Sequence, residues 1–137
     1  MTSILPHGGT LIQRVVQGEE REQLLRESEK LSSLRINSWT ISDLDLIGVG
    51  AFSPLQGFMN EEDYLSVISR MRLADGTVWS IPITLAVDEQ QAAALRIGET
   101  VALIGNDEGW HSSSPHQTSI LPFSSITEPI SAPVSPR

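Results

Sequence analysis

Residues 71–85 read MRLADGTVWSIPITL, and the Asp75-Gly76 pair in this string lies between two apolar runs. Such a pair is a strong signal for a β-hairpin, because glycine readily adopts the backbone angles of a tight turn. The β-branched and apolar run over 77–87 predicts a strand after the turn, with a bulge or a sheet edge at Pro82. The core residues predicted on one face of that strand are Trp79, Ile81 and Ile83.

Short helices and strands are predicted on both sides of the hairpin. Asn60 and Asp88 can each cap a helix, and Gln91 can complete a capping box with Asp88. Helices are predicted over 19–31, 42–47, 60–71 and the residues after 88. Strands are predicted over 36–41, 77–87 and 100–104, and an extended stretch over 11–16. Turns are predicted at 6–9, 53–57 and 106–109. Short strands mixed with short helices indicate an α+β domain with a small mixed sheet or barrel.

Composition limits the class of protein. A chain of 137 residues has the length of one domain. Lys and Arg number 9 against 17 Asp and Glu, and the resulting net charge of -8 argues against binding to nucleic acid or to an anionic membrane by charge. With no cysteine, the chain has no disulfide, thiolate nucleophile or zinc-thiolate site. No apolar run approaches a membrane span, so we expect a soluble, cytoplasmic protein.

The composition changes after Gly109. From residue 110 onward Glu128 and Arg137 are the only charged residues, and Ser and Pro are in excess. Such a segment cannot bury enough apolar surface to offset the entropy lost on ordering. We therefore expect a folded domain over 1–109 and a disordered tail over 110–137.

Several short motifs have a functional and a structural interpretation, and the structural one is favoured for each. Gly48-Val49-Gly50 follows a predicted helix and lacks a third glycine, which favours a helix stop over a nucleotide loop. His7-Gly8-Gly9 predicts a turn, since the chain has no G-x-S-x-G nucleophile. His111 and His116 lack acids at metal-ligand spacing. Glu61-Glu62-Asp63 predicts the start of a helix. No catalytic, cofactor-binding or metal-binding residue is assigned.

Three strings together carry a family resemblance. They are PHGGTL over 6–11, GAFSPLQGFM over 50–59, and the hairpin string over 71–85. In this order and spacing they resemble the N-terminal domain of ATP sulfurylase (sulfate adenylyltransferase), and the resemblance covers about residues 4–109. It implies a PUA-like fold, a small mixed sheet with short flanking helices.

The resemblance also implies where the chemistry of the family is carried out. There, a following nucleotidyltransferase domain joins ATP and sulfate to give adenosine 5′-phosphosulfate and pyrophosphate, with a Q-x-R-N-P motif and an H-x-x-H motif. This sequence contains neither motif: Ser119-Ile120 follows Gln117-Thr118, and His111 and His116 are too far apart. ATP and sulfate are therefore expected to bind only through that other domain, and no cofactor is expected here. The residues that match family positions, with an architectural role expected for each, are His7, Phe52, Pro54, Phe58, Asp75 and Trp79.

The end of the resemblance suggests how this chain arose. We expect a truncation or a reading-frame shift near codon 109, which would leave a sulfate adenylyltransferase fragment that is inactive alone. A stand-alone PUA-like module that binds RNA is an alternative, although Arg70, Arg72 and Arg96 are the only cations over 60–100. A third is an interaction protein that self-associates through the surface meant for its partner domain.

Overall fold

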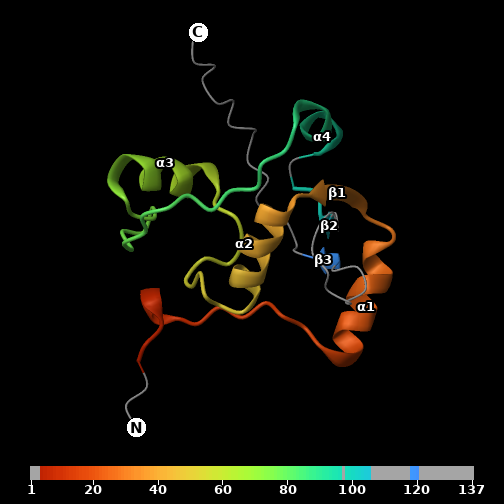
Figure 1. The fold of residues 1–137 in the computed structure, drawn as a ribbon, viewed down its shortest axis with the longest axis horizontal. Helices are drawn as coiled ribbons and strands as arrows, with labels where there is room; N and C mark the ends of the chain where they lie inside the picture. The colour runs from red at the N-terminus through yellow and green to blue at the C-terminus, as the bar shows by residue number, and fades with distance from the viewer. Residues whose placement is uncertain (1–3, 97, 106–117, 121–137) are drawn as a thin grey trace. The chain divides into compact units, whose positions relative to one another are not determined.

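The computed structural model describes residues 4–96, 98–105 and 118–120, and the chain divides into two compact units (Figure 1). The described residues of unit 1 lie within Met1–Phe58 and Thr100–Phe123, and those of unit 2 lie within Met59–Glu99. The elements in chain order are η1 (His7–Gly9), α1 (Gly18–Ser28), β1 (Ser32–Ile36), α2 (Ser38–Gly48), α3 (Glu61–Arg70), α4 (Glu89–Ala94), β2 (Val101–Gly105) and β3 (Thr118–Ile120). Among the described residues, no helix has both the length and the apolar content to span a membrane.

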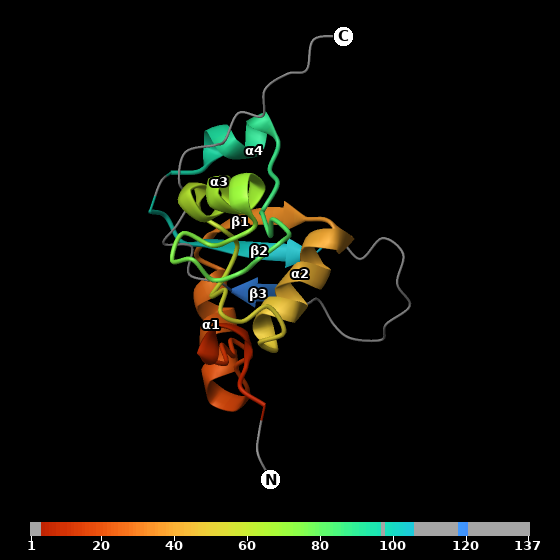
Figure 2. The same cartoon turned by 90° about the vertical axis from the view of Figure 1, so that its left-hand side faces the viewer.

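Unit 1 is built on a mixed sheet with β2 in the middle (Figure 2). β1 pairs with β2 in parallel, with Ser32 opposite Val101, and β3 pairs with β2 antiparallel, with Ala102 opposite Ile120. Val101 and Leu103 on one face of β2 are 0% exposed and Ala102 on the other is 2% exposed, as expected for a central strand covered on both faces. This mixed sheet and its short helices confirm the predicted α+β class.

Helix α2 runs beside this sheet in unit 1 (Figure 1) and begins earlier than the sequence predicted. Asn37 is its N-cap, since Asn37 Oδ1 accepts a 2.9 Å hydrogen bond from the Thr40 N–H. The strand predicted over 36–41 was therefore wrong, because this cap starts the helix directly after β1. The helix predicted over 42–47 is present, but α2 begins at Ser38 and not at Ser42. The buried side chains of α2 are Thr40, Leu44 and Ile47.

In unit 2, α3 begins at the predicted cap. Asn60 Oδ1 accepts a 2.8 Å hydrogen bond from the Asp63 N–H. The predicted turn at Asp75-Gly76 is present as well, with Gly76 at a φ of 92° and the Leu73 N–H bonded to the Thr77 carbonyl at 2.8 Å. The short helix after Asp88 has the full predicted capping box with Gln91.

The predicted strand over 77–87 is not formed. The pairing after the turn is an isolated bridge between Arg72 and Val78, so the two arms do not continue as a ladder. Ile83 is buried as predicted, but Trp79 is only partly buried and Ile81 is exposed. The prediction of a core face shared by these three residues was therefore wrong for Ile81, because side chains alternate between faces only where the backbone stays in a pleated strand.

The Ser/Pro-rich segment contributes β3, since Thr118–Ile120 pairs with β2. The sequence predicted no strand there. Its remaining residues, with the turn predicted at 106–109 and both His111 and His116, lie outside the described residues. The predicted disorder of that remainder stays a prediction.

Candidate functional site

The structure brings two of the three family-like strings together within unit 1. The turn η1 lies against the string over 50–59: a Cβ added to Gly8 would lie 2.7 Å from Cγ of Pro54, so only glycine fits there. Gly8 also has a φ of 73°, which disfavours other residues. His7 is exposed, and Pro54 is partly buried. The expected turn at 6–9 is confirmed, and its contact with Pro54 is architectural.

A second contact joins Ser53 of the string over 50–59 to Ile12, the residue directly after the first string. The Ser53 hydroxyl accepts a 2.9 Å hydrogen bond from the Ile12 N–H and donates a 2.7 Å hydrogen bond to the Gly50 carbonyl. Gly50 has a φ of 84°, and a Cβ on it would lie 2.5 Å from the Ile12 carbonyl oxygen. Gly48 is the last residue of α2, so the helix-stop interpretation of Gly48-Val49-Gly50 is confirmed.

Arg14, two residues after Ile12, makes its hydrogen bonds with backbone carbonyls. Arg14 Nε donates a 3.0 Å hydrogen bond to the Gln56 carbonyl, and the Arg14 N–H donates a 2.9 Å bond to the Gly48 carbonyl. An arginine that binds an anion would direct its guanidinium donors at the ligand. Arg14 instead joins the N-terminal segment to the loop after α2.

In unit 2 the hairpin residues also have local partners. The Thr77 N–H donates a 2.8 Å hydrogen bond to Asp75 Oδ1, and this bond lowers the pKa of the Asp75 carboxyl. The indole Nε1 of Trp79 donates a 2.6 Å hydrogen bond to the Ile81 carbonyl. Both contacts are local: the first lies within the turn and the second within the segment after it. They are in keeping with the architectural role expected for Asp75 and Trp79.

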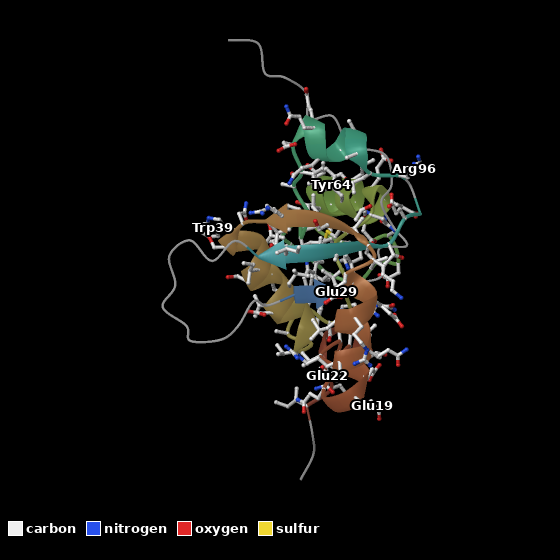
Figure 3. The ribbon with its side chains drawn as sticks, turned by 90° about the vertical axis from the view of Figure 1, so that its right-hand side faces the viewer. Glu19, Glu22, Glu29, Trp39, Tyr64 and Arg96 are labelled. Atoms are coloured by element: carbon white, nitrogen blue, oxygen red, sulfur yellow. The ribbon has the colours of Figure 1, made fainter. Side chains whose placement is uncertain are left out.

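Several of the described acidic residues lie in the first turn of a helix. Glu61, Glu62 and Asp63 occupy the first turn of α3, where carboxylates complement the positive end of the helix dipole. Figure 3 shows Glu19 and Glu22 on α1, with Glu29 directly after it. Within 4–96, 98–105 and 118–120, no group of three His, Asp or Glu side chains is placed to hold a metal ion.

The sequence did not reveal the exposed apolar side chains of α3 and the hairpin. In unit 2 these residues are Leu65, Ile68, Met71, Val78 and Ile81. In the sequence, an apolar stripe at helical spacing predicts an amphipathic helix here, with Tyr64, Leu65, Val67, Ile68 and Met71 on one side. Of these residues only Val67 is buried, and the other buried residue of α3 is Ser66. The stripe was thus too wide to show which of its residues face the core. In unit 1, Trp39 at the start of α2 is 82% exposed (Figure 3).

Comparison with known proteins points to one family. The model of the PUA-like domain family matches residues 4–112. A sulfate adenylyltransferase of Symbiobacterium thermophilum is 46% identical over 102 residues, which are 74% of this chain and 26% of the relative. A sulfate adenylyltransferase of Trichormus variabilis is 48% identical over 101 residues, with the same coverage of 74% and 26%.

Relatives that carry a second activity in their names match over the same extent. A probable bifunctional SAT/APS kinase 2 of Sorangium cellulosum is 48% identical over 104 residues, which are 76% of this chain and 18% of that protein. A solved structure described as a hexameric APS kinase from Thiobacillus denitrificans superposes with a TM-score of 0.65 at 39% identity, over 73% of this chain and 20% of that one. The chain thus spans about a quarter or less of the relatives that it matches.

Proposed function

The chain belongs to the PUA-like domain family, and on that premise we propose that it acts as the accessory, non-catalytic part of a sulfate adenylyltransferase. The observation that carries this proposal is the 46–48% identity to enzymes of that name over about a quarter of their length. The domain supplies a folded scaffold, and the joining of ATP to sulfate takes place on residues outside the matched region.

The described residues support a non-catalytic role. Adenylyl transfer needs donors or cations that stabilise charge on the reacting phosphate, and the removal of one such donor typically lowers the rate by about 100- to 1000-fold. Two of the residues that match family positions bond to the chain's own backbone instead, Asp75 to Thr77 and Trp79 to Ile81, and the Arg14 guanidinium bonds the Gln56 carbonyl. We propose that ATP and sulfate are substrates of the whole enzyme and that this domain binds no cofactor.

An assay of the purified 137-residue chain tests this function. The chain is incubated with ATP, sulfate and Mg²⁺, and pyrophosphate release is measured beside the full-length enzyme of Symbiobacterium thermophilum. We expect the chain to release no more pyrophosphate than a protein-free blank. Sulfate-dependent turnover that coelutes with the chain through repeated purification at constant specific activity would overturn the proposal; turnover that separates from the chain would identify a contaminating enzyme.

Self-association is a second property that we propose, and exposed apolar residues support it. Leu65, Ile68 and Met71 are all exposed and follow one another along α3 and its C-cap, and exposed apolar patches often mark protein contacts. A relative in the solved structures is described as hexameric. Light scattering of the wild type and of Leu65→Glu/Ile68→Glu tests this. We expect a mass above the monomer that falls in the variant; a monomeric wild type would contradict it.

We also propose a cytoplasmic location for this domain. The absence of cysteine and the net charge of -8 support it, because disulfide-free acidic domains suit a reducing compartment and are repelled by anionic membranes and nucleic acid. Fractionation of cells that express the tagged chain tests the location, and recovery with the membrane pellet after a high-salt wash would contradict it.

A further inference from the structure

The segment over 10–16, called the strap below, is attached to the rest of unit 1 by three hydrogen bonds. The Ile12 N–H bonds Ser53 Oγ at 2.9 Å, the Arg14 N–H bonds the Gly48 carbonyl at 2.9 Å, and Arg14 Nε bonds the Gln56 carbonyl at 3.0 Å. All three acceptors belong to residues 48–57, and the strap belongs to no strand of the described sheet. The bonds of Ile12 and Arg14 therefore all end on one short stretch of chain, the last residue of α2 and the loop after it.

Apolar burial contributes little to this attachment. Leu11 and Val15 are 53% and 59% exposed, Ile12 and Val16 are only partly buried, and no residue of the strap is fully buried. Hydrophobic stabilisation is roughly proportional to the apolar area removed from water. The strap is therefore held mainly by its hydrogen bonds, and segments of this kind open at a lower free energy than the core of a protein does.

Ser53 is the residue on which the attachment depends most. Its side chain is almost fully buried, at 3% exposure, and its hydroxyl bonds the Ile12 N–H and the Gly50 carbonyl at the same time. Because one oxygen makes both bonds, the strap and the turn after α2 are coupled. The close approach of Gly50 to the Ile12 carbonyl adds a steric fit to this coupling.

The C-terminal end of the strap has the properties of a hinge. Gly18 has a φ of 62°, and Gln17, the N-cap of α1, makes no side-chain capping bond. Glycine can change its backbone angles at low cost, and hinges are formed by a few residues of this kind at element ends. The chain can thus rotate at this point without breaking a capping contact.

We infer that the strap opens and closes on unit 1 as one piece, with Ser53 as its latch and the Gln17-Gly18 pair as its hinge. Opening releases the carbonyl oxygens of Gly48 and Gln56 and the Ser53 hydroxyl together, while the pairing of β1 with β2 stays intact. The strap therefore controls access to the backbone of the loop over 48–57. This inference does not depend on the enzyme activity of the relatives.

Amide hydrogen exchange of the whole chain, followed by NMR, tests the inference without any mutation. The Ile12 and Arg14 amides report on the strap, and the β2 amides report on the sheet. We expect Ile12 and Arg14 to share one opening equilibrium constant that is at least about 10-fold larger than that of β2. Strap amides that exchange only together with the β2 amides would overturn the inference.

Two substitutions distinguish a strap that opens as one piece from the loss of a single hydrogen bond. Ser53→Ala removes both hydroxyl contacts, and Arg14→Met removes the contact with Gln56 while both reporter amides remain. We expect about 10-fold faster exchange at Ile12 and at Arg14 alike in Ser53→Ala, a smaller joint increase in Arg14→Met, and no change in β2. Ser69→Ala is the matched control, since its hydroxyl also bonds backbone carbonyls but lies in α3.

One result in Ser53→Ala would contradict a strap that opens as one piece. Faster exchange at Ile12 with unchanged exchange at Arg14 in Ser53→Ala would mean that one bond was lost and nothing moved as a unit. An equal increase at the strap and at β2 would mean that the variant unfolds globally. In that second case Arg14→Met decides, because a joint increase confined to Ile12 and Arg14 supports the strap and an unchanged pair overturns it.

Discussion

Asp63 Oδ1 accepts a 2.8 Å hydrogen bond from the Ala74 N–H, and so joins the first turn of α3 to the hairpin that follows it. The Asp63 N–H in turn donates to Asn60 Oδ1 at 2.8 Å. The Asp63 carboxylate therefore connects two parts of unit 2, in addition to complementing the helix dipole. A residue that the sequence predicted only as part of an acidic helix start has a second partner 11 residues away.

We expect Asp63→Ala to lower the free energy of unfolding by about 1–3 kcal/mol, because the Ala74 N–H loses a charged acceptor. Urea unfolding followed by circular dichroism measures this change. Glu62→Ala is the control, since Glu62 is an exposed neighbour in the same turn, and it should change stability by less than about 0.5 kcal/mol. Equal effects of the two variants would mean that the bond to Ala74 contributes nothing.

The N-cap of α2 gives a second prediction. Asn37 Oδ1 accepts hydrogen bonds from both the N–H and the hydroxyl of Thr40. Asn37→Ala should therefore destabilise the chain by about 1 kcal/mol, whereas Asn37→Asp keeps the acceptor and should stay close to the wild type. Thermal unfolding of the three proteins measures the effect, and a wild-type stability in Asn37→Ala would show that α2 needs no cap.

Gly50 combines backbone and steric constraints, and a third prediction separates them. Gly50→Ala should destabilise the chain by more than about 2 kcal/mol, because a left-handed backbone costs about 1–2 kcal/mol for a residue with a Cβ and that Cβ would also meet the Ile12 carbonyl. Gly9→Ala is the matched control, since Gly9 has a φ of 85° but nothing close to its added Cβ. Chemical unfolding compares the two, and equal losses would rule out a steric role for the strap.

The acid Asp43 on α2 gives a pH-dependent prediction. Partial burial raises the pKa of the Asp43 carboxyl above its usual value in the folded chain. The folded state then holds this proton more tightly than the unfolded state does, so stability falls as the pH rises through the interval between the unfolded and folded pKa values. Asp43→Asn should be more stable than the wild type at pH 7, by up to about 0.5 kcal/mol.

The same variant has a built-in control. Well below the unfolded pKa the Asp43 carboxyl is protonated in both states, so the difference between Asp43→Asn and the wild type should vanish there. Urea unfolding at acid and neutral pH measures both values. A stability difference that is the same at both pH values would show that the effect of the substitution is not electrostatic.

The success of each prediction from the sequence depended on how far apart along the chain the interacting residues lie. The caps at Asn60 and Asp88 and the turn at Asp75-Gly76 were predicted correctly, because each depends on partners within a few residues. The boundary between β1 and α2 was misplaced, because Ile36 and Ile41 also fit a strand pattern and the Asn37 cap was not weighed. The contact between Ser53 and Ile12 joins residues 41 apart, and no local pattern encodes it.

The parallel pairing of Ser32 with Val101 has a consequence for synthesis on the ribosome. All of Met59–Glu99 is translated between the two strands, so β1 leaves the exit tunnel long before its partner exists. The side chains of Leu34 and Ile36 in β1 are buried in the folded chain, but they cannot be covered by the complete sheet until β2 has been synthesised. Such late pairing exposes apolar surface to aggregation and makes the growing polypeptide a client for chaperones.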